Sequence, residues 1–569
     1  MARTALSHGR KRFRILSRFL VLAVLAGSLT TTVHAQQQGS GDCRLGPHRD
    51  RITKTLNSIT VEKQETSSAT NARGQAYRIA DVSFSGTLDG CVVLQGAIPS
   101  LKPDYSYLYD VPDVSLPQED LLAQDQTKPY PLPLSPGDGN TSTRYYAEGR
   151  FEAKDGAGIR FFFPATSDNW NRKLFLIQHG SGAYTRRGEE LVPRADSDPF
   201  APGAGENLFI ENMMDKGYAV AYFRKDAMRA PGGVSKVVTR DRKTLTATFI
   251  SHVALPLAMA EFAQGFVQKA LGLAPRRTYY YGHSGGGITA RLIHAAPGAN
   301  RSPDGDLIID GFLVDDAGAG LYLPVVFQNG RDVLFQDPTD RATYVPTLEV
   351  AHQLYNPLSY LQAKRANANL LREKGLGDKH RYYEVRGLSH FDAGMARRYT
   401  AGQNIQLMPR DSLDMSGVFG ALIDVLDQWV DQGVTPPPSR ADIAGYDPAL
   451  AVPEVACPLG VYYAPGGGNT SRFAPFDGQS FEPELGEGGG AFLDMNLNGT
   501  QDKRDTVTAA WMRGGLLPAG AEVGLDQYRA CLAETAGELV KARFLPSGSD
   551  RWYEQQADSF YRKSGAVFK

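Results

Sequence analysis

A serine between glycines has the clearest chemical potential in this chain of 569 residues. The segment GHSGG at 282–286 fits the pattern G-x-S-x-G, which alone is weak evidence in a chain with 60 glycines. Its neighbours strengthen it, because residues 277–281 have the aromatic and β-branched character of a strand and residues 288–296 that of a helix. A sharp turn between the two would raise Ser284 above a sheet, as a nucleophile requires.

A nucleophilic serine needs a base, and ten histidines are available. His390 follows the predicted strand 381–385 and lies downstream of Ser284, in agreement with the chain order serine, acid, histidine. His352, at the end of the preceding predicted strand, is the alternative. We predict that His390 is the general base.

The carboxylate that would orient this histidine has three candidates. It commonly follows the strand before the histidine, but the segment 346–356 has no carboxylate at its end, and Glu349 lies within the strand. The earlier predicted strand 307–314 ends in Asp315 and Asp316. We favour Asp316 or Asp315, with Glu349 as the alternative.

Backbone N–H groups must stabilise the negative oxygen that forms when serine attacks a carbonyl group. Gly180 and Ser181 follow the predicted strand 172–178, and their small side chains would let the backbone approach a substrate. Gly285 would supply the second N–H at the start of the helix. We expect Gly180 or Ser181 to act together with Gly285.

A second chemical signal lies near the C-terminus, where a twelve-residue loop has oxygen-bearing residues at calcium-ligand spacing. Gly499 occupies the sixth position, where such a loop turns sharply. The final ligand is an aspartate instead of the usual glutamate. We predict a structural Ca²⁺ site formed by Asp494, Asn496, Asn498, Thr500, Asp502 and Asp505. No cofactor is expected for catalysis.

The composition is that of a folded protein, with 42% hydrophobic and 22% charged residues. The net charge of −1 gives no bulk electrostatic argument for nucleic acid or an anionic membrane as a partner. Residues 1–35 combine a basic start, a short apolar run at 19–26 and a cleavage site at 33–35, which predicts an export signal. No later apolar run is long enough for a membrane span, so we expect a secreted protein, periplasmic or extracellular.

Export would favour disulfides among the four cysteines. None of them lies in a C-x-x-C pair or beside a histidine, so a zinc site is not expected. The simplest of three connectivities pairs Cys43 with Cys91 and Cys457 with Cys531; buried free thiols are the alternative.

Three regions follow the signal. Residues 36–145 are predicted to form a β-rich module, because β-branched and aromatic runs alternate with turn residues. Residues 146–435 alternate predicted strands and helices, which favours a mostly parallel sheet covered by helices on both faces. The proline run at 435–440 predicts a stiff linker to a C-terminal extension, 436–569.

From about residue 150 onward the chain resembles bacterial proteins described as α/β-hydrolase domain proteins. The resemblance rests on DGFLVDDAGAG at 310–320, PPPSR at 436–440, VPEVACPL at 452–459 and LVKARFLP at 539–546. It implies the α/β-hydrolase fold, ester hydrolysis and no organic cofactor.

A looser likeness to tannases and feruloyl esterases rests on NLFIEN at 207–212 and GYAV at 217–220. That group flanks its serine and histidine with paired cysteines, which this chain lacks there, so its substrate is not carried over. The leading hypothesis is a serine esterase acting on small-molecule or polymeric esters. A serine peptidase of the same fold and an inactive, calcium-stabilised binding protein are the alternatives.

Overall fold

The computed structural model describes most of the chain from residue 52 onward. The described residues are 52–96, 143–153, 158–179, 184–187, 190–193, 210–224, 228–229, 255–295, 300–302, 304–317, 326–328, 332–334, 341, 344–355, 361–396, 412–464, 468–478 and 506–569. The predicted export signal, Cys43 and the predicted calcium loop lie outside them.

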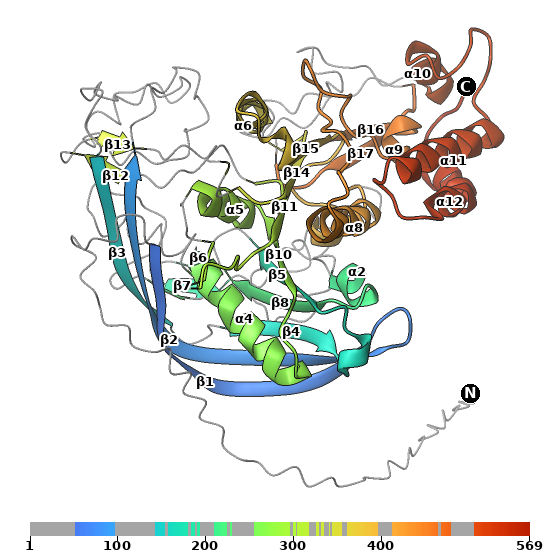
Figure 1. Cartoon of the computed structure of the whole chain (residues 1–569). Coiled ribbons are helices and arrows are strands. Elements are labelled where there is room, and N and C mark those ends of the chain that lie inside the picture. The colour runs from blue at the N-terminus through green and yellow to red at the C-terminus, as the bar shows by residue number, and fades with distance from the viewer. Residues whose placement is uncertain are drawn as a thin grey trace, which may run out of the picture.

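A sheet of eleven strands runs through the described part of the chain (Figure 1). Six neighbouring strands are parallel, and the remaining strands continue the sheet in antiparallel fashion. In sheet order the parallel strands are β15 (His380–Val385), β14 (Thr347–His352), β11 (Gly311–Asp315), β10 (Arg277–His283), β5 (Lys173–His179) and β8 (Ala219–Arg224). β4 (Gly158–Pro164), β2 (Ala76–Gly96), β3 (Thr143–Ala153) and β9 (Met228–Arg229) follow, and β1 (Ile52–Thr70) pairs with β2.

Helices cover both faces of the parallel strands. Tyr279 and Tyr281 of β10 belong to the apolar core under α2 (Ile210–Asp215) and α8 (Ser416–Gln432). Tyr280, between them, points into the opposite core under α4 (Leu255–Leu271) and α5 (Gly285–Ala295). This alternation is the two-residue period of a strand that is buried on both faces. The predicted fold class is confirmed.

The strands of the predicted N-terminal module belong to this same sheet. β1 and β2 form a long antiparallel pair, and β2 also pairs with β3 and with β4. β4, which the sequence did not single out, connects them because it pairs in turn with β8. The boundary expected near residue 145 therefore falls within a continuous sheet, inside β3.

The proline run that was expected to be a stiff linker packs against the last strand of the sheet. The backbone oxygen of Pro437 accepts a hydrogen bond of 2.9 Å from the hydroxyl of Tyr383. Isolated bridges then pair Arg440 with Tyr383 and Leu450 with Val385. The chain beyond residue 435 thus continues along β15 instead of leaving the domain.

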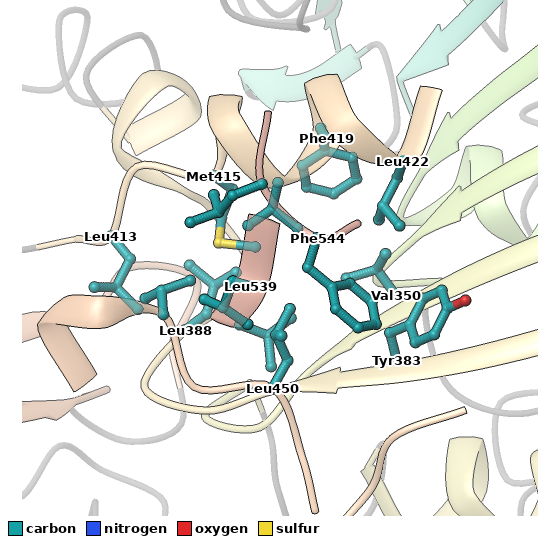
Figure 2. Packing of buried hydrophobic residues seen from close by; sticks show 14 of the residues in the cluster. Val350, Tyr383, Leu388, Leu413, Met415, Phe419, Leu422, Leu450, Leu539 and Phe544 are labelled. Carbon is teal, nitrogen blue, oxygen red and sulfur yellow. The ribbon is translucent and has the colours of Figure 1, made fainter. Parts of the chain in front are cut away.

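The C-terminal extension covers the core between β15 and α8, as Figure 2 shows. Phe544 lies among Val350, Tyr383 and Phe419, and Leu539 packs toward Leu388 and Leu450. The extension contains α9 (Pro453–Ala456), β16 (Gly460–Tyr463), β17 (Arg472–Pro475), α10 (Val507–Arg513), α11 (Leu525–Lys541) and α12 (Ser549–Lys563).

Cys457 and Cys531 form a disulfide, which links the start of this extension to α11 and confirms one of the two expected pairings. The partner expected for Cys91, Cys43, lies outside the described residues. Within the portion of the chain that the structure describes, none of the helices has the length and apolar character needed to cross a membrane.

Candidate active site

Ser284 occupies a turn between β10 and α5. Its φ of 56° lies in the left-handed region, which residues other than glycine rarely adopt. Two backbone bonds fix this conformation: the N–H of Ser284 donates to the oxygen of Asp315 at 2.9 Å, and its oxygen accepts from Ile288 at 3.1 Å. The strand, the strained serine and the helix that follows are the arrangement that presents a nucleophile above a sheet.

Two glycines of the GHSGG segment have no room for a side chain. A Cβ atom on Gly282 would lie 2.3 Å from the backbone oxygen of Gly286, and one on Gly286 would lie 2.3 Å from that of Gln178. The turn can therefore close only without side chains at these positions. α5 begins at Gly285, so the predicted oxyanion donor stands in the first turn of a helix, where backbone N–H groups have no partner within the helix.

His390 and Asp316 form a buried pair beside this turn. The loop after β15 brings the His390 ring to 4.4 Å from the ring of His283, the neighbour of Ser284 in the chain. Its Nδ1 lies 2.5 Å from Oδ2 of Asp316, the residue after β11. Because Nδ1 donates its proton to the carboxylate, Nε2 is the nitrogen that can accept one. Tyr355 stacks on the ring, with centroids 4.0 Å apart.

The second oxygen of Asp316 is also occupied. Oδ1 accepts hydrogen bonds from Nζ of Lys364 and from the backbone N–H of His352, the latter at 3.0 Å. The side chains of Lys364 and Asp316 are both fully buried. Lys364 was not predicted as a site residue from the sequence. The one feature that could have indicated it is that this lysine lies on the buried side of α6 (Gln362–Glu373).

Asp315 has different partners. Its Oδ2 lies 2.9 Å from Nδ1 of His283 and accepts a bond of 2.7 Å from the hydroxyl of Tyr281. Its Oδ1 lies 2.9 Å from Nε2 of His352. His352, the alternative base, lies between the two aspartates, with its Nδ1 2.7 Å from the backbone oxygen of Ser389 and 3.7 Å from Oδ2 of Asp316.

Glu349 lies away from His390, so the interpretation of this residue as the triad acid is wrong. Its carboxylate pairs with the guanidinium of Arg291 and lies 3.2 Å from Nε2 of His380. The reason is its position inside β14, three residues before the end of the strand, where side chains face the neighbouring elements instead of the carboxyl edge. It is a buried structural carboxylate.

Burial and neighbouring charges set the protonation of the two aspartates and of His390. Burial alone would raise the pKa of Asp316, but Lys364 and His352 outweigh it and hold that pKa well below its usual range. The pKa of Asp315 is also depressed, since His352 and His283 outweigh its burial. Burial lowers the pKa of His390 to about 4, and His283 acts in the same direction. His390 is therefore neutral near pH 7.

His352 has the opposite shift. Burial would lower its pKa, but Asp316 and Asp315 overcome this and raise the pKa above its ordinary value. Of the two histidines, His352 is the one that carries a proton most readily, and His390 is the one available as a base.

Two groups of predicted site residues lie outside the described part of the chain. Gly180 and Ser181, the other oxyanion donors, lie outside the described residues. So do all six predicted calcium ligands: Asp494, Asn496, Asn498, Thr500, Asp502 and Asp505. Among the residues that are described, no cluster of three or more His, Cys, Asp or Glu side chains is arranged to hold a metal ion.

The comparisons agree with this fold. Residues 250–460, which contain Ser284, both aspartates and His390, match the family model described as "Alpha/beta hydrolase domain". No curated protein matches the sequence significantly.

Solved structures give weaker similarities. Est1E from Butyrivibrio proteoclasticus is 16% identical and has a TM-score of 0.24, covering 45% of this chain and 95% of its own. The poly(3-hydroxybutyrate) depolymerase LpqC from Bordetella parapertussis is 13% identical and has a TM-score of 0.28, covering 51% of this chain and 88% of its own. The looser likeness to tannases is not confirmed. The family match and the parallel sheet together show that this chain carries an alpha/beta hydrolase domain.

Proposed function

We propose that this protein is a serine esterase in which Ser284, His390 and Asp316 form the catalytic triad. One observation carries the proposal: the only serine of a G-x-S-x-G turn in the chain has a left-handed φ of 56°, beside a buried histidine whose Nδ1 lies 2.5 Å from a carboxylate. A structural turn would have no need of that strain together with such a pair.

In the proposed mechanism, Oγ of Ser284 attacks the carbonyl carbon of the ester while Nε2 of His390 takes the serine proton. The negative charge on the carbonyl oxygen is stabilised by the N–H of Gly285, together with the expected donor at Gly180 or Ser181. Collapse of the intermediate releases the alcohol, which receives the proton from His390. Water then attacks the acyl-enzyme by the same route and releases the acid.

The acyl-transfer chemistry of the proposed triad supports carboxylic esters, small or polymeric, as the substrate class. The export signal predicted at 1–35 supports action outside the cytoplasm. A mature chain beginning at Gln36, determined by N-terminal sequencing of protein recovered from the periplasm or medium, would be the expected product.

The test is labelling of the full chain with a fluorophosphonate, followed by peptide mapping. Ser284 should carry the label, and Ser284→Ala should lose both the label and ester hydrolysis, by about 10⁴-fold or more. Ser412→Ala, at a buried serine near the loop of His390, is the matched control and should keep both. Label on a different serine, or more than a tenth of the activity in Ser284→Ala, would refute the proposal.

A screen of short-chain, aromatic and polymeric esters would then define the acyl and alcohol groups that are accepted.

A further inference from the structure

The pair formed by Asp316 and His390 is part of a larger buried charge network. Two carboxylates, Asp315 and Asp316, lie at the end of β11, each 1% exposed or less. Facing them and the His390 ring are His283 at the end of β10, His352 at the end of β14, Lys364 on α6, and Tyr281, Tyr355 and Asp392.

A count of charge constrains which of these groups carries a proton. The two aspartates contribute two negative charges, and burial raises the pKa of Asp392 to about 7, so that group is largely protonated in acidic solution. Lys364 offsets one of the two negative charges. Because isolated charges are costly in a buried region, one further positive charge is expected among the histidines.

Geometry selects the histidine that bears this charge. His352 lies between both aspartates, with Nε2 at 2.9 Å from Asp315 and Nδ1 at 3.7 Å from Asp316. His283 approaches Asp315 alone, through Nδ1 at 2.9 Å. His390 contacts one, and that one already accepts from Lys364 on its other oxygen. A carboxylate whose charge is already offset stabilises a nearby imidazolium less than an uncompensated one does.

We propose that Lys364 is a positioning residue of the triad: it fixes the orientation and charge of Asp316 so that His352, and not His390, carries the balancing proton. His390 thereby stays available as a base in acidic solution. This inference rests on the proposed function for its catalytic meaning, but the placement of the protons can be measured without turnover.

The principal test is the pH profile of kcat/KM for ester hydrolysis by the full chain. The base must be neutral to act, so activity is lost as pH falls through the pKa of His390. Lys364→Met removes the cation and retains an apolar stem. The acid limb of the profile, which is the pH range over which activity falls as His390 becomes protonated, should then move to higher pH by roughly one unit. Lys364→Arg keeps the charge and should leave the limb where the wild type has it.

The matched control is Arg365→Met. Arg365 is the next residue on α6, but it pairs with Glu384 and not with either aspartate. Its removal should lower the melting temperature without moving the limb. If Lys364→Met likewise lowers the melting temperature or the rate but leaves the limb unmoved, Lys364 has only a structural role and the proposal is overturned.

A measurement on the wild type covers the case in which Lys364→Met does not fold. In protein labelled with ¹³C at histidine, with signals assigned from His352→Gln and His390→Gln, His352 should be protonated at pH 5.5 and His390 neutral. The reverse order would overturn the proposal. If the order is as expected and no ester is hydrolysed, the proposed function fails while the assignment of protons stands.

Discussion

Asp316→Asn gives the sharpest test of the triad. In the wild type, Oδ2 of Asp316 at 2.5 Å from Nδ1 fixes the proton on that nitrogen, which in the proposed mechanism leaves Nε2 of His390 to accept the serine proton. An amide whose NH₂ group faces Nδ1 instead requires the proton to be on Nε2, where it blocks the base. We expect kcat to fall by about 10⁴-fold, which corresponds to about 5.4 kcal/mol in the activation barrier.

The same substitution leaves the buried cation of Lys364 without its carboxylate. Breaking a buried ion pair from one side costs about 3–5 kcal/mol in the free energy of unfolding. Domains have about 5–15 kcal/mol of stability, so the variant should stay folded at 25 °C with a lower melting temperature. Activity must therefore be expressed per folded molecule, with circular dichroism and a nitrophenyl ester assay on the same samples.

Two controls separate the loss of a base from the loss of a buried charge. Asp310→Asn alters a carboxylate at the opposite end of β11, where it pairs with Arg277 at 3.0 Å. Glu349→Gln breaks a buried pair with Arg291 away from His390. Both should keep kcat within a few-fold of the wild type, and Glu349→Gln should lose stability. The reasoning is refuted if Asp316→Asn retains more than a tenth of the activity, or if Glu349→Gln loses as much.

Three further outcomes are expected. Gly286→Ala should prevent the turn at Ser284 from folding, because its Cβ would lie 2.3 Å from a backbone oxygen of β5. Gly265→Ala in α4 is the control: its Cβ would meet nothing within 4 Å, and the variant should have a higher melting temperature. Burial raises the pKa of Asp392 to about 7, and it raises the pKa of Glu454 similarly, so each carboxyl group should cost stability as pH rises from about 4 to about 7. Asp392→Asn should therefore lose less stability than the wild type between pH 5 and pH 8, and denaturant melts in which both proteins change alike would disprove this. A calcium chelator should lower the melting temperature of the protein but not the activity of the folded protein. Asp494→Ala combined with Asp505→Ala should make the melting temperature the same with and without chelator. A wild-type melting temperature that the chelator does not change would exclude the calcium site.

The sequence was sufficient for the elements that carry the site. The glycines around Ser284, the strand before it and the helix after it are local features, and each lies within a few residues of its predicted bounds. The placement of His390 beside this turn could be predicted for a similar reason, since its loop follows a recognisable strand. Short-range pattern and chain order are enough for such residues.

The choice between Asp315 and Asp316 was beyond the sequence. The two are adjacent and chemically identical, and only the backbone at the end of β11, where Asp316 has a φ of 40°, decides which carboxylate turns toward His390. Lys364 is 48 residues away from its partner Asp316 and looks like any helical lysine until α6 packs on the strand ends. The continuity of the sheet through β4 was missed because pairing with β2 and β8 is a long-range property.

The packing of Phe544 bears on when this protein can fold. Its ring meets that of Tyr383 on β15 with centroids 5.0 Å apart, so a face of the central sheet is completed by a residue made about 160 positions later. Until that segment has been synthesised, the apolar side chains around Val350 and Leu450 lack part of their cover. The hydrolase domain therefore completes its core only late in synthesis, and an incomplete chain would expose apolar surface of the kind that promotes aggregation.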